Sequence, residues 1–212
     1  MAVPKLVGKY LKSAVLERDY PPEDRPEVVI AGRSNAGKSS FINMLTNQKL
    51  AHVSGQAGKT RLLNFFDLGP HYRLVDIPGY GFAARAHDET QMWKKMVETY
   101  LSSRPNLVGL LLLADVRRDW TAEEDLLLQY LRTRNVPAAM VFTKIDKLNQ
   151  KDLARRKAKL QSEIKKRAFT IESSFFVSLL PTKDKRNLTV EVENFVFTKW
   201  VHPSVRQGVQ RG

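Results

Sequence analysis

The chain has 212 residues and no cysteine, so a disulfide framework, thiolate catalysis and cysteine-ligated metal are excluded. Its net charge is +13, of which residues 147–212 carry +9; this excess suits polyanion binding and an ordinary solvated helix face with a basic tail equally well. No apolar run is long enough to span a bilayer and the N-terminus lacks a signal-peptide core, so we expect one soluble, cytoplasmic domain.

The first 26 residues are predicted to be an N-terminal extension and connector. Apolar residues between Leu6 and Val15 are spaced like one face of a helix, whereas residues 12–19 suit an edge strand equally well. The pattern does not decide between the two. Residues 21–26 contain three prolines, which is typical of a rigid, exposed connector into the main domain.

A glycine-rich turn then joins a predicted strand at residues 28–31 to a predicted helix that runs to about Thr46. Its glycines allow backbone N–H groups to converge on phosphate oxygens, and the N-terminus of the helix adds positive potential. Lys38 is expected to reach the β- and γ-phosphates, and Ser39 to bind Mg²⁺. The predicted phosphate-binding residues are Gly32, Arg33, Ser34, Asn35, Ala36, Gly37, Lys38 and Ser39. This turn alone does not distinguish ATP from GTP.

After this helix, residues 47–60 show no periodicity and are predicted to form a loop. Residues 61–66 and 72–75 each read as a strand, and the Gly-Pro turn between them predicts an antiparallel hairpin. Thr60 directly precedes the hairpin. Its position between a phosphate-binding turn and an acidic strand end makes it a candidate second hydroxyl ligand to Mg²⁺.

Asp76, Ile77, Pro78 and Gly79 follow the second strand of this hairpin. Ligands of open α/β sheets sit at the carboxyl ends of strands. An Asp there can hold Mg²⁺ directly or through water, and the N–H of the glycine can face a γ-phosphate. We therefore expect this segment to lie beside the phosphates.

Strands and helices alternate through the middle of the chain. Residues 88–102 read as an amphipathic helix, and Thr121 with Glu124 forms a capping box for another. Residues 109–114 and 137–142 are continuously apolar, as expected of buried parallel strands. The alternation predicts a three-layer α/β fold with about six strands, mostly parallel with one antiparallel strand, and helices on both faces.

Base specificity is predicted from Thr143, Lys144, Ile145 and Asp146, which follow the 137–142 strand. A carboxylate at a strand end can accept two hydrogen bonds from the N1–H and 2-amino groups of guanine, a donor pair that adenine lacks. Adenine would leave the acceptor buried and unpaired, which costs heavily. We therefore expect Asp146 to select guanine, with the aliphatic stem of Lys144 packed on the base.

The last third of the chain is basic. A helix is predicted over residues 149–168, a last strand over 173–177, and a closing helix ending near Trp200, although local alternation there also permits a strand. A hydroxyl or N–H of Ser178 is positioned to contact the guanine carbonyl. We divide the chain into the extension at 1–26, the main domain at 27–201 and a basic tail at 202–212.

The order of these motifs resembles the EngB (YihA/YsxC) family of ribosome-biogenesis GTP-binding proteins. Four stretches carry the resemblance, at residues 32–40, 58–66, 75–82 and 143–146. It implies a P-loop NTPase fold of the Ras-like G-domain type and Mg²⁺-dependent GTP binding and hydrolysis. It also implies a role in assembly of the large ribosomal subunit, with cell division affected when that role fails.

The resemblance assigns roles by position. Ser39 and Thr60 would be the Mg²⁺ ligands, residues 58–62 the first switch, and residues 177–179 the last guanine loop. Besides the glycine-rich turn, the implied contacts to GTP are Gly58, Lys59, Thr60, Arg61, Leu62, Asp76, Ile77, Pro78, Gly79, Thr143, Lys144, Ile145, Asp146, Val177, Ser178 and Leu179. Two departures stand out: Ala57 occupies a place commonly held by proline, and residues 177–179 replace a usual Ser-Ser pair.

The catalytic residues are the weakest part of this assignment. Tyr80 stands where Ras-like enzymes have the glutamine that orients the attacking water, so we expect slow intrinsic hydrolysis. Asn35 matches the position at which similar K⁺-dependent GTPases hold a monovalent cation, which makes K⁺ a candidate activator. The candidate catalytic residues are Lys38, Thr60 and Asn35.

Two classes of function remain open. One is a GTPase switch that docks on the large ribosomal subunit or its rRNA through the basic last third. The other is a nucleotide-gated rRNA- or membrane-binding module in which hydrolysis is incidental. In either case we expect GTP and GDP as ligands, no insertion into a membrane, and a monomer.

Overall fold

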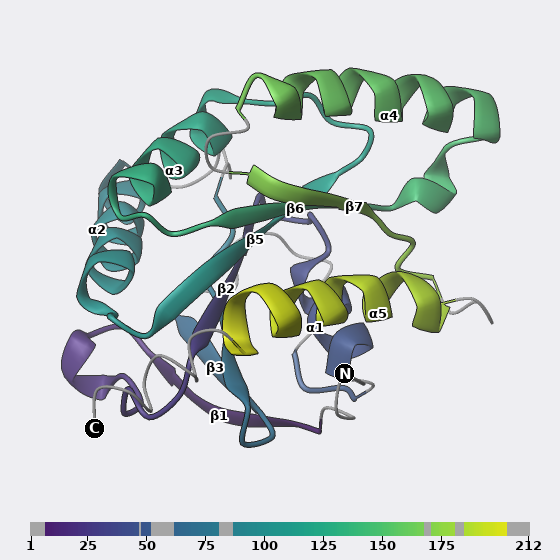
Figure 1. Ribbon diagram of the computed structural model, residues 1–212. Coiled ribbons are helices and arrows are strands. Elements are labelled where there is room, and N and C mark those ends of the chain that lie inside the picture. Colours follow the sequence, from purple (N-terminus) through teal and green to yellow (C-terminus); the bar gives the residue numbers. More distant parts are fainter. Residues whose placement is uncertain are drawn as a thin grey trace.

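The computed structural model describes residues 7–46, 48–51, 62–80, 87–167, 171–180 and 185–202, and for residues 87–90 and 185–189 it describes the backbone alone. Within these ranges a twisted sheet forms the centre and helices lie on both faces (Figure 1). The strands are β1 (Gly8–Ala14), β2 (Glu27–Gly32), β3 (Leu63–Leu68), β4 (Tyr72–Asp76), β5 (Leu107–Asp115), β6 (Ala138–Thr143) and β7 (Ile171–Phe176). The helices are η1 (Glu17–Asp19), α1 (Lys38–Thr46), α2 (His87–Ser103), α3 (Ala122–Thr133), η2 (Ile145–Lys147), α4 (Gln150–Lys165), α5 (Lys185–Phe195) and the π-helical turn η3 (Val196–Val201).

The strands of the sheet follow the order β1-β3-β4-β2-β5-β6-β7. β3 runs antiparallel to both of its neighbours, β1 and β4, and every other pair is parallel. The predicted mostly parallel sheet with one antiparallel strand is therefore confirmed. Because β2, β4, β5, β6 and β7 are parallel, their carboxyl ends lie along the same edge, where ligands of such sheets bind.

The sheet has seven strands rather than the six expected, and the extra one is β1. The sequence left this segment open between a helix and an edge strand at residues 12–19. Residues 8–14 are extended and pair with β3, so the segment is a strand that begins earlier than residue 12. A β3 without this neighbour would leave a row of unpaired N–H and C=O groups along the edge of the sheet. This pairing joins Gly8 to Leu68, a non-local contact that local spacing could not reveal.

Each face of the sheet is covered by its own apolar core. Tyr100 of α2, Leu128 of α3 and Leu160 of α4 belong to one cluster, and Phe41 of α1 and Val192 of α5 belong to the other (Figure 1). Each of these five side chains is almost fully buried. The central strands are buried on both faces, which explains why they read as continuous apolar runs and not as alternating ones.

Most predicted elements are confirmed, with boundaries that shift by a few residues. The α3 capping box forms as expected, because the N–H of Thr121 donates to Glu124 Oε2 at 2.8 Å. Asn149 caps α4 by accepting from the N–H of Asp152 at 2.9 Å. The closing segment is helical, which resolves its ambiguous alternation. The predicted tail lies almost wholly outside the described residues.

The connector at residues 21–26 is held by a buried charge cluster that the sequence did not predict. Glu27, at the start of β2, lies 3.1 Å from Arg73 and 2.5 Å from Arg104. The two guanidinium groups then donate to the carbonyls of Pro22 at 2.9 Å and Pro21 at 3.1 Å. A buried carboxylate paired in this way fixes the path of the chain at the end of β2 away from the glycine-rich turn.

Candidate nucleotide-binding site

The glycine-rich turn between β2 and α1 has the backbone of an anion cradle. Asn35 and Gly37 have φ values of 65° and 94°, in the left-handed region that lets successive N–H groups point inward. The N–H groups of Gly37, Lys38 and Ser39 make no backbone hydrogen bond to a described residue. They belong to the first turn of α1 and just before it, where donors have no partner within the helix. A phosphate is the ligand that such a site favours.

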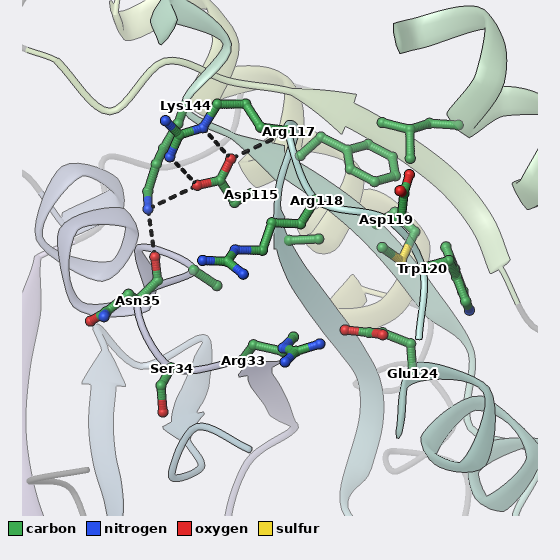
Figure 2. A pocket seen from close by; sticks show the side chains of 15 residues that line it. Arg33, Ser34, Asn35, Asp115, Arg117, Arg118, Asp119, Trp120, Glu124 and Lys144 are labelled. Atoms are coloured by element: carbon green, nitrogen blue, oxygen red, sulfur yellow. Dashed lines mark hydrogen bonds and ion pairs between the residues drawn. The ribbon is translucent and has the colours of Figure 1, made fainter. Parts of the chain in front are cut away.

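Two carbonyl oxygens of the same turn accept hydrogen bonds from side chains at the end of β6. The N–H groups of the turn therefore remain available to a ligand. The hydroxyl of Thr143 donates to the carbonyl of Ala36 at 2.7 Å, and Lys144 Nζ donates to the carbonyl of Asn35 at 2.6 Å. Figure 2 shows the Lys144 side chain reaching this carbonyl from the end of β6. Two residues predicted to serve base recognition therefore also hold the phosphate-binding turn.

Lys144 is itself held by Asp115, at the end of β5. Lys144 Nζ lies 3.1 Å from Asp115 Oδ2, and Arg117 donates to the same carboxylate from Nε at 2.9 Å and Nη2 at 2.6 Å (Figure 2). Burial alone would raise the pKa of Asp115, but the hydrogen bonds from Arg117 and Lys144 outweigh it and hold that pKa well below its usual range. Sequence reasoning missed both Asp115 and Arg117. The only signal was an acidic residue at the end of an apolar strand.

Asp146 and Ser178 are brought together across the tips of β6 and β7. The hydroxyl of Ser178 donates to Asp146 Oδ1 at 2.8 Å, and Lys147 Nζ lies 3.7 Å from Oδ2. The N–H of Ile145 donates to the carbonyl of Val177 at 3.4 Å. The two loops predicted to contact guanine are thus adjacent, and the carboxylate is oriented by a neighbouring hydroxyl. A carboxylate held in this way keeps its other lone pairs available for two donors on one base edge.

Leu179, the last residue of that predicted loop, packs against the glycine-rich turn. A Cβ added to Gly37 would lie 2.4 Å from Leu179 Cδ1, so no larger residue fits at position 37 without moving Leu179. The predicted guanine loop at residues 177–179 therefore lies directly beside the phosphate cradle.

Asp76 is a buried carboxylate at the end of β4, and one of its oxygens has no partner. It is 4 % exposed, Oδ1 makes no hydrogen bond, and Lys38 Nζ lies 4.0 Å away. Burial raises the pKa of Asp76, while the charge of Lys38 and a hydrogen bond from Asn64 oppose the rise. An unsatisfied buried oxygen of this kind is costly unless a ligand supplies a partner.

These residues fit Mg²⁺ in part. Mg²⁺ prefers oxygen ligands and in nucleotide sites is bound through one or two protein oxygens together with substrate phosphates. The hydroxyl of Ser39, in the first turn of α1, and the free oxygen of Asp76 supply such ligands. The other predicted ligand, Thr60, lies outside the described residues, as do Gly58, Lys59 and Arg61. Leu62 is described and exposed.

The Asp76–Gly79 segment passes directly against the glycine-rich turn. The N–H of Ser34 donates to the carbonyl of Tyr80 at 3.0 Å. A Cβ added to Gly79 would lie 2.9 Å from the Ser34 nitrogen and 3.2 Å from Lys38 Nζ. Only glycine permits this approach, which brings the segment to the phosphate side of Lys38.

The side chain of Tyr80 is buried and bonded to α3. It is 4 % exposed, and its hydroxyl donates to Glu124 Oε1 of α3 at 3.0 Å. Its ring packs on Trp93 of α2, and Trp93 Nε1 donates to the carbonyl of Pro78 at 2.8 Å. The phenol therefore joins the segment after β4 to α2 and α3.

Comparison with known proteins gives consistent matches. A family model described as a 50S ribosome-binding GTPase matches residues 27–144. The chain is 48 % identical to a probable GTP-binding protein EngB of Bdellovibrio bacteriovorus over 201 residues, which is 95 % of this chain and 96 % of that protein. It is 46 % identical to the corresponding protein of Geobacter metallireducens over 152 residues, 71 % of this chain and 74 % of that one.

Solved structures support the fold. A crystal structure of a probable GTP-binding protein engB aligns with a TM-score of 0.58 and 21 % identity over 81 % of this chain and 96 % of that one. Era in complex with MgGDPNP and nucleotides 1506–1542 of 16S ribosomal RNA aligns with a TM-score of 0.58 and 22 % identity over 81 % of this chain and 57 % of that one. At these identities the likeness concerns the fold alone.

Proposed function

Because the chain belongs to the EngB family of GTP-binding proteins, we propose that it is a GTPase switch that binds the large ribosomal subunit during assembly, with an effect on cell division. One observation carries the guanine-nucleotide part of this proposal. The phosphate cradle, the buried Asp76 and the Asp146–Ser178 pair lie along one edge of the sheet, and Lys144 at the end of β6 holds the carbonyl of Asn35 in the cradle.

Guanine selection is assigned to Asp146, because its carboxylate is held by Ser178 and offers the two acceptors that the guanine edge requires. In the Asp146→Asn variant, an amide donor would face the guanine N1–H or 2-amino group. We expect affinity for GDP to fall by about 100-fold or more, and affinity for xanthosine diphosphate, which carries a carbonyl at that position, to rise. Fluorescence titration with GDP, xanthosine diphosphate and ADP measures this.

Asp19→Asn serves as the matched control, because Asp19 lies in the exposed turn η1 and makes no side-chain contact with the site. It should bind all three nucleotides as the native chain does. Native affinities for GDP and ADP within tenfold of each other would contradict guanine selection by this site.

Mg²⁺ is the proposed metal, held by Ser39 and Thr60 with Asp76 acting directly or through water. When bound, it would neutralise the charge that develops on the β- and γ-phosphates. Lys38 would supply a further positive charge on the same phosphates, and the N–H groups of Gly37 to Ser39 would orient them.

K⁺ is proposed as an activator through Asn35. This residue sits at the exposed tip of the turn with φ of 65°, and its carbonyl is fixed by Lys144, so its side chain is presented by a rigid backbone. GTP turnover measured with large ribosomal subunits in KCl and in NaCl tests the assignment. Equal rates in the two salts would contradict the assignment of K⁺ as an activator.

Intrinsic hydrolysis is proposed to be slow, because the hydroxyl of Tyr80 is engaged by Glu124 and the residue does not offer the amide that orients water in Ras-like enzymes. Single-turnover GTP cleavage with and without large subunits measures this. Strong stimulation supports a hydrolytic switch. Slow cleavage in both conditions, with binding that depends on the nucleotide, would support the nucleotide-gated module instead.

The RNA-binding surface is proposed to be the outer face of α4. Lys151, Arg155 and Lys165 are exposed there and pair with no acidic side chain among the described residues. In an α-helix, residues four apart are separated by about 6 Å along the axis, a spacing comparable with that of successive phosphates on an RNA strand. Not every basic residue of α4 is available, because Arg156 and Lys159 pair with Asp119.

Ribosome binding is tested by co-sedimentation with large subunits in the presence of GTP, GDP or no nucleotide. We expect binding to depend on the nucleotide and to be lost after ribonuclease treatment. In the part of the chain that the structure describes, no helix has both the length and the apolar character to cross a membrane. Retention on anionic vesicles with no binding to subunits would favour the membrane-surface alternative.

A further inference from the structure

A row of polar side chains leads across three strands from the edge of the sheet to Asp76. Ser13 of β1 is paired in register with Asn64 of β3, and Asn64 is paired in register with Asp76 of β4. Side chains at directly opposite positions of neighbouring strands lie on the same face and within contact of one another. We call Ser13, Asn64 and Asp76 the polar row.

The hydrogen bonds of the polar row have a defined direction. The hydroxyl of Ser13 donates to Asn64 Oδ1 at 2.6 Å, and Tyr10 adds its own hydroxyl 2.8 Å from Ser13 Oγ at the outer end. Because Oδ1 of Asn64 is already an acceptor, its amide nitrogen is left to donate, and Asn64 hydrogen-bonds the carboxylate of Asp76. Ser13 therefore determines which end of the Asn64 amide faces Asp76.

The position of the polar row within the sheet indicates that it is more than an incidental surface contact. Further along the same face, Phe66 and Leu68 of β3 and Tyr72 and Leu74 of β4 belong to the apolar core under α1 and α5. The polar row stands only at the end of β4 that meets the glycine-rich turn. A chain that needed only to pack β1 against β3 could place apolar residues at these positions, as it does at the others.

The inner end of the polar row leaves one oxygen of Asp76 free. Asn64 lies opposite Asp76 in the register of β3 and β4, whereas Oδ1 of Asp76 has no hydrogen-bond partner among the described residues and lies 4.0 Å from Lys38 Nζ. Partners that hold a carboxylate near a metal fix its orientation, and their loss weakens metal binding. We propose that Ser13 and Asn64 are positioning residues that hold Asp76 so that its free oxygen meets the Mg²⁺ of a bound guanine nucleotide.

This inference rests on the proposed function for the identity of the ligand, and it gives the N-terminal strand a part in the site. The inference separates the metal-dependent part of nucleotide binding from the rest. The polar row should matter for the Mg²⁺-dependent part of nucleotide affinity and not for the contacts of the base or of the β-phosphate, because Asp76 is remote from Asp146 in the sheet order.

The test is the affinity for GDP measured twice for each variant, in Mg²⁺ and in EDTA. The ratio, the dissociation constant in EDTA divided by the dissociation constant in Mg²⁺, is the factor by which the metal strengthens binding. For Asn64→Ala we expect the ratio to fall by about tenfold, and for Ser13→Ala by a few-fold, because Ser13 acts only through Asn64. Affinity in EDTA should stay within about twofold of the native value.

Leu11→Ala is the matched control. Leu11 lies in β1 at the irregularity between Tyr10 and Lys12, is largely exposed and makes no contact with the polar row, so its truncation disturbs the same strand without touching Asn64. A fall in the ratio for Leu11→Ala equal to that for Ser13→Ala would overturn the proposal, because general loosening of β1 would then explain the effect. An unchanged ratio in Asn64→Ala would overturn it as well.

A second measurement does not depend on any ligand. Urea denaturation of the nucleotide-free chain is compared for native protein, Asn64→Ala, Asp76→Ala and the double variant. Coupled side chains give non-additive shifts of the midpoint, and additive shifts would show that Asn64 does not hold Asp76. If the native chain bound no guanine nucleotide, the proposed function would fail, and this cycle would still decide whether the polar row holds Asp76.

Discussion

At the scale of single residues, Tyr80 shows how a side chain next to a catalytic segment can serve the scaffold. The sequence predicts that it cannot orient water, and the structure gives its contacts: a hydroxyl on Glu124 and a ring on Trp93. Glu124 also accepts from the N–H of Thr121 in the capping box of α3. The phenol therefore fastens the segment after β4 to the first turn of α3.

Tyr80→Phe tests this role. The substitution removes one buried hydrogen bond to a carboxylate, so we expect the free energy of unfolding to fall by about 1–3 kcal/mol. GDP affinity should stay within about twofold of native, because the hydroxyl is engaged by Glu124 of α3. Tyr130→Phe is the control, since its hydroxyl donates to the exposed carbonyl of Glu98 at 3.2 Å, and its cost should be smaller. Native stability with GTP hydrolysis reduced more than tenfold would instead place the Tyr80 hydroxyl at the nucleotide.

Residues at the site differ in how far the sequence could predict them. The glycine-rich turn and Asp146 follow from local spacing, because each role depends on a motif within a few residues. Asp115 does not, because its importance comes from the adjacency of β5 and β6, which places it beside Lys144. The sequence predicted only that the aliphatic stem of Lys144 contacts the base. The partners of its ammonium group, Asp115 and the carbonyl of Asn35, depend on which strands are neighbours and could not be predicted from local spacing.

At the scale of elements, the end of β5 is linked to the end of β6 through Asp115. The pKa of Asp115 lies below its ordinary value, so its ionised form stabilises the folded chain. This contribution is fully present above the pKa of the unfolded carboxyl, near 4, and is lost as the pH falls through the lower folded pKa.

Asp115→Asn should therefore lower the free energy of unfolding by about 1–3 kcal/mol at pH 7. Between pH 7 and about 5 the difference from the native chain should be constant, and below about pH 4 it should shrink. Chemical denaturation across this pH range measures it, with Asp152→Asn on α4 as the control. A difference that grew as the pH fell would contradict the assignment of the ionised form.

Helix α4 carries two kinds of arginine side by side. Arg156 donates to the carbonyl of Val116 at 2.6 Å and to Asp119 at 2.6 Å, so it fastens the helix to the loop after β5. Arg155 is exposed and has no acidic partner among the described residues. The sequence presents both as members of one basic run, and only the packing of the helix separates them.

The pair Arg155→Ala and Arg156→Ala should separate stability from RNA binding. We expect Arg156→Ala to lower the free energy of unfolding by about 1–2 kcal/mol, since its partners are partly exposed, and to leave affinity for large subunits unchanged. Arg155→Ala should leave stability unchanged and lower that affinity a few-fold. Denaturation and co-sedimentation on the same preparations measure both, and the reverse assignment of effects would contradict our division of α4.

The edge strand β1 marks the limit of element prediction. Long, strongly periodic helices and continuously apolar strands were predicted with the correct type, because their patterns are local. β1 was left open between a helix and an edge strand, because local spacing fits both and the strand is stabilised by pairing with residues 49 to 60 positions away. The polar row depends on the same pairing, so it could not be inferred without the register.

At the scale of the whole molecule, topology brings separate motifs to one edge and leaves the positive charge elsewhere. The glycine-rich turn, Asp76 and Asp146 come from three strands that share a direction. The excess charge of residues 147–212 falls partly on α4, which in Figure 1 lies above the sheet, on the face opposite to α5. A nucleotide and a polyanion can therefore be bound on different surfaces of one domain.

The salt dependence of RNA binding tests this arrangement for the whole molecule. Each phosphate that a protein cation neutralises contributes roughly 0.7–0.9 to the slope of log K against log salt concentration. If Lys151, Arg155 and Lys165 each contact one phosphate, replacing all three with alanine should reduce the magnitude of the slope by about 2–3. Titration of large subunits at several KCl concentrations gives the slope directly.

A variant with Lys9, Lys12 and Lys95 replaced by alanine has the same net charge, but its changes lie on exposed positions of β1 and α2. If binding depended on net charge alone, the two triple variants would have equal slopes, and α4 would lose its special role. If α4 is the contact surface, the control keeps the native slope, because long-range attraction is screened within about 10 Å at 0.1 M salt and only cations at the phosphates release counterions.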